Sequence, residues 1–120
     1  MKTILIIDDE NYINRLVHFN LLEDGYNVIT SSSGREGLEL IKKRRPDLVI
    51  LDIAMPEMDG FTVMEKMRED DRLREIPVLV LTAKVMEDVE NRARKLGAAG
   101  FMTKPFSPSD LSSRVSEIIG

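Results

Sequence analysis

The sequence predicts an α/β fold, a doubly wound parallel sheet of five strands with helices on both faces. Short apolar runs of strand length alternate five times with longer segments whose apolar residues recur at helical spacing. The runs are nearly continuous in apolar character, which is typical of parallel strands that are buried on both faces. Right-handed crossovers between such units favour the strand order 2-1-3-4-5, a flavodoxin-like sandwich of three layers.

The first unit begins close to the N-terminus. Residues 4–7 form an apolar strand that ends at Asp8-Asp9. A helix is expected next, and Gly25 can end it because glycine readily adopts the left-handed conformation. The apolar face of this helix is expected to comprise Ile13, Leu16, Val17 and Leu21.

The second unit has a strand expected over residues 26–30. Ser33 followed by Glu36 is a capping-box pattern that predicts the start of a helix, which carries Leu38 and Ile41. The basic run 42–45 closes this helix before Pro46. We interpret that run as a complement to the helix dipole rather than as a nucleic-acid signal.

The third unit has an apolar strand over residues 48–51, directly followed by Asp52. Asp59-Gly60 can start the next helix, and Pro77 introduces a fourth strand over residues 78–81. The apolar positions of the third helix are Phe61, Met64 and Met67, and those of the fourth are Val85, Val89, Ala93 and Leu96.

The fifth unit begins after Gly97, which is expected to end the fourth helix. A short strand is expected around Phe101, and Ser107-Pro108 then carries the clearest helix start, with an N-cap residue followed by proline at the first helical position. The inward face of this last helix is expected to comprise Leu111, Val115 and Ile118.

Composition limits the function classes. With 120 residues, 42% of them hydrophobic, and no linker-like segment, we expect one domain over residues 1–120. The formal net charge of −4 does not favour nucleic acid or an anionic membrane as a direct partner. The absence of cysteine and the presence of a single histidine exclude thiolate chemistry and histidine metal clusters. No signal-peptide core is present, so a cytoplasmic location is expected.

Acidic residues follow two of the expected strands. In the order 2-1-3-4-5, the first and third strands are neighbours, so Asp8, Asp9 and Asp52 should meet at one sheet edge, with Thr82 and Lys104 alongside. Carboxylates about 4 Å apart repel by roughly 4 kcal/mol at an effective dielectric near 20. Such a group protonates or binds a cation, and oxygen ligands favour Mg²⁺, Mn²⁺ or Ca²⁺.

Each of these residues, taken alone, could also have a purely structural role. Asp8 and Asp9 could cap the helix that follows them, Thr82 could be an ordinary strand residue, and Lys104 could be a solvated lysine. Asp52 is harder to explain in that way, because a charge directly after a buried strand is costly unless it is paired or bound to metal.

Taken together, the residues at four strand ends match a known pattern. The matching elements are Asp8-Asp9, the segment 52–60 that opens with Asp52, Thr82-Ala83, and Lys104-Pro105. The chain resembles the receiver domain of bacterial response regulators, and the resemblance covers essentially its whole length. A sequence of such sites in the right order is far more specific than any single motif.

The resemblance implies a role for each matched residue. Asp52 would accept a phosphoryl group from a phosphohistidine, and Asp9, Asp52 and the backbone carbonyl of Ala54 would bind Mg²⁺, or alternatively Mn²⁺, with Asp8 acting through bound water. Lys104 would pair with Asp52 and then with the phosphoryl oxygens, and a cis peptide bond before Pro105 would aim this lysine into the site. The switch residues would be Thr82, next to Ala83, and Phe101.

The resemblance also implies partners. A sensor histidine kinase or phosphotransfer protein would donate the phosphoryl group, with the helix around Tyr12, Leu16 and Phe19 as its docking surface. A downstream protein would read the face formed by the fourth helix, fifth strand and fifth helix, because the chain stops directly after that helix. No direct nucleic-acid or membrane partner is expected. The unphosphorylated protein is expected to be a monomer, and dimerisation after phosphorylation stays open.

Three alternative functions share parts of this pattern. A haloacid-dehalogenase type of phosphohydrolase is disfavoured because Asp52-Ile53-Ala54 lacks the second aspartate of that class. A flavodoxin-like binding module would need a phosphate loop where Asp8-Asp9 stands. A phosphorelay shuttle shares every site residue and differs only in its partner.

Four features depart from common receivers. Ala54 has no side chain that could orient an attacking water, and Lys84 places a positive charge near the site entrance, so both bear on phosphoryl lifetime. Phe101 lacks the hydroxyl of the tyrosine often found at its position. The segment 97–100 lacks the paired acids that support one type of active dimer.

Overall fold

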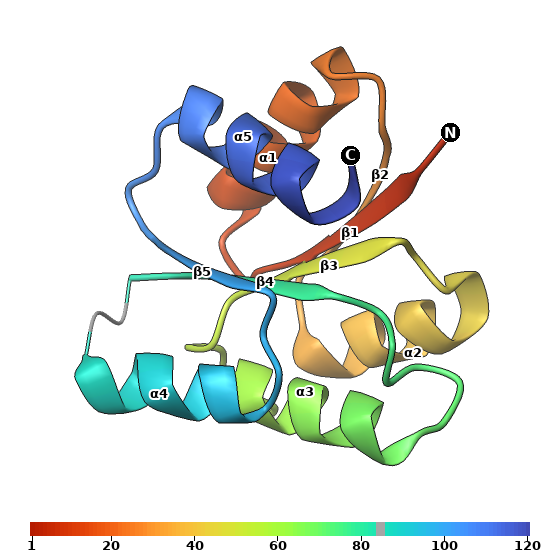
Figure 1. Ribbon diagram of the computed structural model, residues 1–120, viewed down its shortest axis with the longest axis vertical. Helices are drawn as coiled ribbons and strands as arrows, with labels where there is room; N and C mark the ends of the chain where they lie inside the picture. The colour runs from red at the N-terminus through yellow and green to blue at the C-terminus, as the bar shows by residue number, and fades with distance from the viewer. Residues whose placement is uncertain (84–85) are drawn as a thin grey trace.

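The computed structural model describes residues 1–83 and 86–120, and its centre is a parallel sheet of five strands (Figure 1). The strand order is β2-β1-β3-β4-β5, and every neighbouring pair is parallel, which confirms the predicted topology. The strands are β1 (Thr3–Ile7), β2 (Asn27–Ser31), β3 (Leu48–Leu51), β4 (Val78–Thr82) and β5 (Gly100–Thr103).

Helices cover both faces of this sheet. Figure 1 shows α1 and α5 on one face and α2, α3 and α4 on the other, as the predicted right-handed crossovers require. The helices are α1 (Asn11–Glu23), α2 (Gly34–Arg44), α3 (Gly60–Glu69), α4 (Glu87–Lys95) and α5 (Pro108–Ile119). Among the described residues, each helix is too short or too polar to cross a bilayer.

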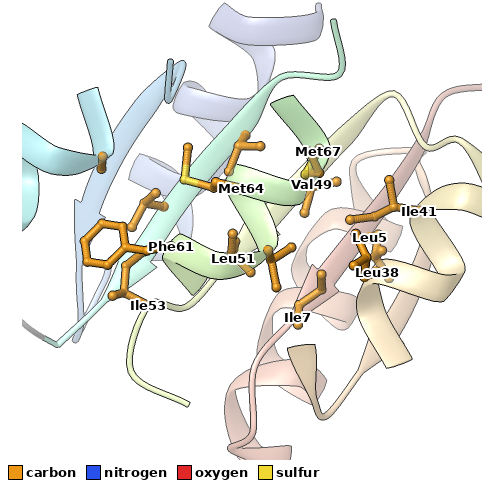
Figure 2. Close-up of a cluster of buried hydrophobic side chains, with 14 of the residues drawn as sticks. Leu5, Ile7, Leu38, Ile41, Val49, Leu51, Ile53, Phe61, Met64 and Met67 are labelled. Atoms are coloured by element: carbon orange, nitrogen blue, oxygen red, sulfur yellow. The ribbon is translucent and has the colours of Figure 1, made fainter. Parts of the chain in front are cut away.

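The strands divide the interior into two apolar layers, because successive side chains point to opposite faces. Leu5 and Ile7 of β1 face α2 and α3, in the layer drawn in Figure 2. Ile4 and Ile6 of the same strand face α1 and α5. This two-sided burial explains the unbroken apolar runs of residues 4–7, 48–51 and 78–81 in β1, β3 and β4.

Helix ends follow the signals read from the sequence. Ser33, Asp59 and Ser107 cap α2, α3 and α5, each by accepting a hydrogen bond from a backbone N–H three residues ahead. Gly25 and Gly97 have φ angles of +93° and +86°, so both adopt the expected left-handed conformation. The capping box of α2 is only half formed, because the Glu36 carboxylate accepts from the Ser31 hydroxyl at 3.0 Å and from the Ser32 N–H at 3.4 Å rather than from the N-cap.

Some details of the expected elements were wrong. Strand β2 covers residues 27–31 instead of 26–30, because its register is set by pairing with Thr3 to Ile7. Leu16 is 41% exposed, since the inward arc of α1 is centred on Val17 and includes Asn14. In the α4 region, however, Ala93 is buried and Val89 and Leu96 pack against the core as expected, whereas the expected position Val85 lies outside the described residues.

Candidate functional site

The candidate site lies at the carboxyl edge of the sheet, where β1 and β3 end side by side. Ile7 pairs with Leu51, so the residues that follow them, Asp8 and Asp52, are neighbours at the sheet edge. Both aspartates are buried, with 0% and 4% of their surface exposed. In the part of the chain that the structure describes, carboxylate oxygens of Asp8, Glu10 and Asp52 lie within 4.8 Å of one another.

Lys104 brings a positive charge into this cluster from the end of β5. Its Nζ atom lies 2.7 Å from Asp8 Oδ2, 2.9 Å from Glu10 Oε1 and 3.2 Å from Asp52 Oδ2. The lysine side chain is only 7% exposed, so these contacts are screened little by solvent. The peptide bond between Lys104 and Pro105 is cis, as the resemblance implied.

Burial and charge shift the pKa values of the two central groups in the same direction. Burial raises the pKa of Asp8, and the Asp52 charge adds to that effect, whereas Lys104 and the Glu10 N–H oppose it. Burial by itself lowers the pKa of Lys104, but its contacts with Asp8, Glu10 and Asp52 outweigh burial and raise that pKa above its ordinary value. The lysine is therefore a firmly held cation.

Glu10 was not among the predicted site residues, although its carboxylate lies beside those of Asp8 and Asp52. Asp9 is exposed and lies outside the group of three carboxylates. The turn places Glu10 in the cluster, because the Glu10 N–H donates to Asp8 Oδ1 at 2.9 Å and the Glu10 carboxylate accepts from Lys104 Nζ. The acidic triplet Asp8-Asp9-Glu10 is the signal in the sequence that could have indicated this third carboxylate.

The backbone around Asp52 is fixed by hydrogen bonds and by close packing. The Asp52 N–H donates to the Ile7 carbonyl at 3.0 Å, and the Ala54 N–H donates to Asp52 Oδ1 at 3.2 Å. Glycine is required at residue 60, because a Cβ atom there would lie 2.4 Å from the Asp52 carbonyl oxygen. The start of α3 therefore abuts the peptide that carries Asp52.

The predicted switch residues lie on β4 and β5. Thr82 is fully buried at the end of β4, and its carbonyl accepts from the Lys104 N–H at 3.0 Å. Ala83 is exposed directly after it, and Phe101 is partly buried and packs against the α3 and α4 layer. Lys84, expected near the entrance, lies outside the described residues.

The donor set fits a hard divalent cation. Three carboxylates against one ammonium leave two negative charges without compensation in the cluster. Asp8 Oδ2 is buried and accepts no hydrogen bond within residues 1–83 and 86–120, although Lys104 Nζ forms an ion pair with it at 2.7 Å. Carboxylate and carbonyl oxygens are the ligands of Mg²⁺ and Mn²⁺.

An apolar strip lies on the outer face of α1, the helix that begins three residues after Asp8. Tyr12, Phe19 and Leu22 are 63%, 66% and 53% exposed, and Leu16 lies between the first two. Side chains three and four residues apart share one helix face, so the four form a continuous stripe. Exposed apolar stripes of this kind mark protein-interaction surfaces.

Comparison with known proteins agrees with the geometry. The family model described as the response regulator receiver domain matches residues 4–116. The chain is 42% identical over 118 residues to the alkaline phosphatase synthesis transcriptional regulatory protein PhoP of Bacillus subtilis, covering 98% of this chain and 48% of that protein. It is 40% identical to the DNA-binding dual master transcriptional regulator RpaA of Synechocystis, covering 99% of this chain and 49% of that protein. The chain therefore spans about half the length of these curated relatives.

Solved structures show the same fold. Chemotaxis protein CheY4 of Vibrio cholerae has a TM-score of 0.93 and 32% identity, and the match covers 98% of both chains. The signal receiver domain of a signal transduction histidine kinase from Syntrophus aciditrophicus has a TM-score of 0.90 and 34% identity, with 99% of this chain and 90% of that chain covered.

Proposed function

The chain belongs to the response regulator receiver domain family, and from this premise we propose that it is a phosphorylation switch whose acceptor is Asp52. Receiver domains are signalling switches of two-component systems rather than classical enzymes. The observation that carries the proposal is the burial of Asp52 beside Asp8, with Lys104 Nζ within 3.2 Å of its carboxylate. We propose residues 1–120 as one receiver unit.

In the proposed reaction, a carboxylate oxygen of Asp52 attacks the phosphorus of a phosphohistidine. The new P–O bond forms as the P–N bond breaks, and the electron pair of that bond returns to the donor imidazole. Such transfers need in-line positioning and neutralisation of the phosphoryl charge. Lys104 supplies fixed positive charge, first toward Asp52 Oδ2 and then toward the phosphoryl oxygens.

A divalent cation would be held by the carboxylates of Asp8, Asp9 and Asp52 and by the Ala54 carbonyl, and would neutralise phosphoryl oxygens. Mg²⁺ is the proposed ion, with Mn²⁺ as an alternative. Glu10 joins the residues that respond to the cation, because it shares Lys104 with Asp8 and Asp52. A bound cation would neutralise these carboxylates, and Lys104 could then pair with the phosphoryl oxygens.

The proposed output is a change of packing at β4 and β5. Thr82 would donate its hydroxyl to the phosphoryl group, and Phe101, which is only partly buried, would turn inward. The added charge of about −1.5 to −2 would thereby shift the population between two packings. A downstream protein partner would read the α4, β5 and α5 face, and a dimer of the phosphorylated protein is the second form of output.

The donor partner would be a histidine kinase or phosphotransfer protein. The apolar stripe of α1 (Tyr12, Leu16, Phe19 and Leu22) supports this proposal, because it lies on the helix that begins three residues after Asp8. A partner seated there can present its histidine to the carboxyl edge of the sheet. A cytoplasmic location and a monomeric resting state are part of the same proposal.

The proposal is tested by the intact mass of the protein after incubation with acetyl phosphate and Mg²⁺. The expected result is a single phosphoryl adduct in the wild type and in Asp71→Asn, a surface control that changes charge in the same way. Asp52→Asn and wild-type protein treated with a chelator should gain none. An adduct that persists in Asp52→Asn would contradict the assignment of the acceptor.

A further inference from the structure

Asn14 is a buried polar residue in the inward face of α1. Only 6% of its surface is exposed, although its neighbours on that face, Ile13 and Val17, are apolar. Both N–H groups of its side chain are used, because Nδ2 lies 2.8 Å from the Asp8 carbonyl oxygen and 3.2 Å from the Ser31 carbonyl oxygen. The side chain thus joins the ends of β1 and β2.

The oxygen of the Asn14 side-chain amide, in contrast, lowers the stability of the fold. Asn14 Oδ1 is buried and accepts no hydrogen bond from the described residues, which costs free energy. An apolar side chain at this helix position would avoid that penalty and would suit the layer around it. The two bonds to backbone carbonyls are therefore what asparagine contributes here.

Those bonds act on the conformation of Asp8. The Asp8 N–H donates to the Ser31 carbonyl at 3.1 Å, which fixes the peptide before the Asp8 Cα atom. Asn14 Nδ2 holds the Asp8 carbonyl, which fixes the peptide after that atom. With both peptide planes held, the φ and ψ angles of Asp8 are set, and so is the direction of its Cα–Cβ bond. The Glu10 N–H, which donates to Asp8 Oδ1 at 2.9 Å, then orients the carboxylate itself.

We infer that Asn14 is a positioning residue of the cation site, which acts by holding the backbone of Asp8. This inference rests on the proposed function, because it assigns Asn14 to the site that is proposed to bind Mg²⁺. Substitution of a residue that orients a metal ligand commonly weakens metal affinity by about 10–100-fold. Asn14 donates to the backbone carbonyl of Asp8 rather than to a carboxylate, so its effect passes through the Asp8 backbone.

Asn14→Leu tests the inference, because leucine keeps a similar volume and removes both donors. Asn20→Leu is the matched control on the same helix, since Asn20 Nδ2 also donates to a backbone carbonyl, that of Pro108 at 3.1 Å, but far from the site. Mg²⁺ affinity is measured by calorimetry on folded protein, and urea unfolding is measured separately without Mg²⁺.

The expected result is a Mg²⁺ dissociation constant about 10–100-fold higher in Asn14→Leu and close to wild type in Asn20→Leu. A merely structural role would change urea unfolding and leave the affinity of the folded protein unchanged. Equal affinity in Asn14→Leu and wild type overturns the inference alone. A wild type that binds no Mg²⁺ overturns the proposed function and the inference with it.

A second measurement keeps the test decisive if Asn14→Leu does not fold. In ¹⁵N-labelled wild-type protein, the Nδ2 protons of Asn14 should shift during a Mg²⁺ titration and saturate together with the Asp8 amide. Asn20 Nδ2 should not follow that curve. A saturating shift at Asp8 with no response at Asn14 overturns the inference.

Discussion

The buried carboxylate of Asp8 lowers the folding stability of the protein at neutral pH. Its side chain is fully buried, and burial raises its pKa despite the nearby ammonium of Lys104. The folded state therefore holds the Asp8 proton more tightly than the unfolded state does. Folding stability contributed by this group falls as pH rises from the ordinary aspartate pKa of 3.8 through the higher pKa of the folded state.

Asp8→Asn is expected to stabilise the protein at pH 7 in the absence of divalent cation, by about 0.5–2 kcal/mol, because it removes the buried charge. The gain should shrink below about pH 3.8, where the wild-type carboxyl is protonated in both states. Urea unfolding at pH 7 and below pH 3.8 measures the difference in unfolding free energy between Asp8→Asn and wild type, with Asp71→Asn as a surface control. A less stable Asp8→Asn at pH 7 would show that the ion pair with Lys104 outweighs burial.

Sequence patterns located some site residues and could not locate others. Asp8, Asp52 and Lys104 follow strands, so strand order alone placed them at one edge. Glu10 needed the turn that folds it back toward Lys104, and Asn14 needed two contacts with backbone carbonyls at the ends of β1 and β2. Those contacts leave no periodic signal, because a single polar residue within an apolar helix face has many explanations.

At the scale of elements, Arg68 joins three segments on the α3 and α4 face of the sheet. From the last turn of α3, its Nε donates to the Leu96 carbonyl at 2.8 Å, and its Nη2 donates to the Gly97 carbonyl at 3.3 Å. Its Nη1 lies 2.6 Å and 3.3 Å from the Arg74 and Ile76 carbonyl oxygens. Burial lowers the pKa of this guanidinium, although the nearby Glu75 opposes that effect.

Arg68→Met is expected to lower the free energy of unfolding by about 2–3 kcal/mol, because four carbonyls lose a charged donor. Amide exchange at the end of α4 should accelerate in the same variant. Arg68→Lys should not restore stability, since an ammonium cannot reach both segments as a fork does. Arg72→Met, which removes an exposed pair with Asp70, is the control. Equal stability of Arg68→Met and Arg72→Met would contradict the joining role.

The type and order of the helices and strands could be predicted from the sequence, because the residues that start and end them act locally. Caps at Ser33, Asp59 and Ser107 and left-handed glycines mark helix ends through contacts within a few residues. The start of β2 was misplaced because register depends on the partner strand, and Leu16 was misplaced because the inward direction of α1 depends on its docking angle.

At the scale of the whole molecule, cation binding and folding are coupled. The carboxylates that repel one another are brought together only by the folded sheet, so the folded state should bind Mg²⁺ better than the unfolded chain does. Binding of that kind stabilises the entire fold rather than one segment.

Mg²⁺ at ten times its dissociation constant should therefore raise the free energy of unfolding by about 1.4 kcal/mol relative to chelator-treated protein. The slope of the unfolding free energy against urea concentration should not change, because the surface exposed on unfolding is the same with and without Mg²⁺. Asp52→Asn should show a smaller rise. Urea titrations with and without Mg²⁺ measure this effect. An unchanged midpoint in a protein that binds Mg²⁺ by calorimetry would mean that the unfolded chain binds it equally well.

The contact between Lys104 and Glu10 also has a consequence for biosynthesis. It spans 94 residues, and the contact between Lys104 and Asp52 spans 52, so the cation that compensates the carboxylates leaves the ribosome long after them. A nascent chain that pairs β1 with β3 brings Asp8 and Asp52 together without their lysine. Ambient divalent ions would then serve as a counter-ion until Lys104 has been translated, and the proposed site would be incomplete before that point.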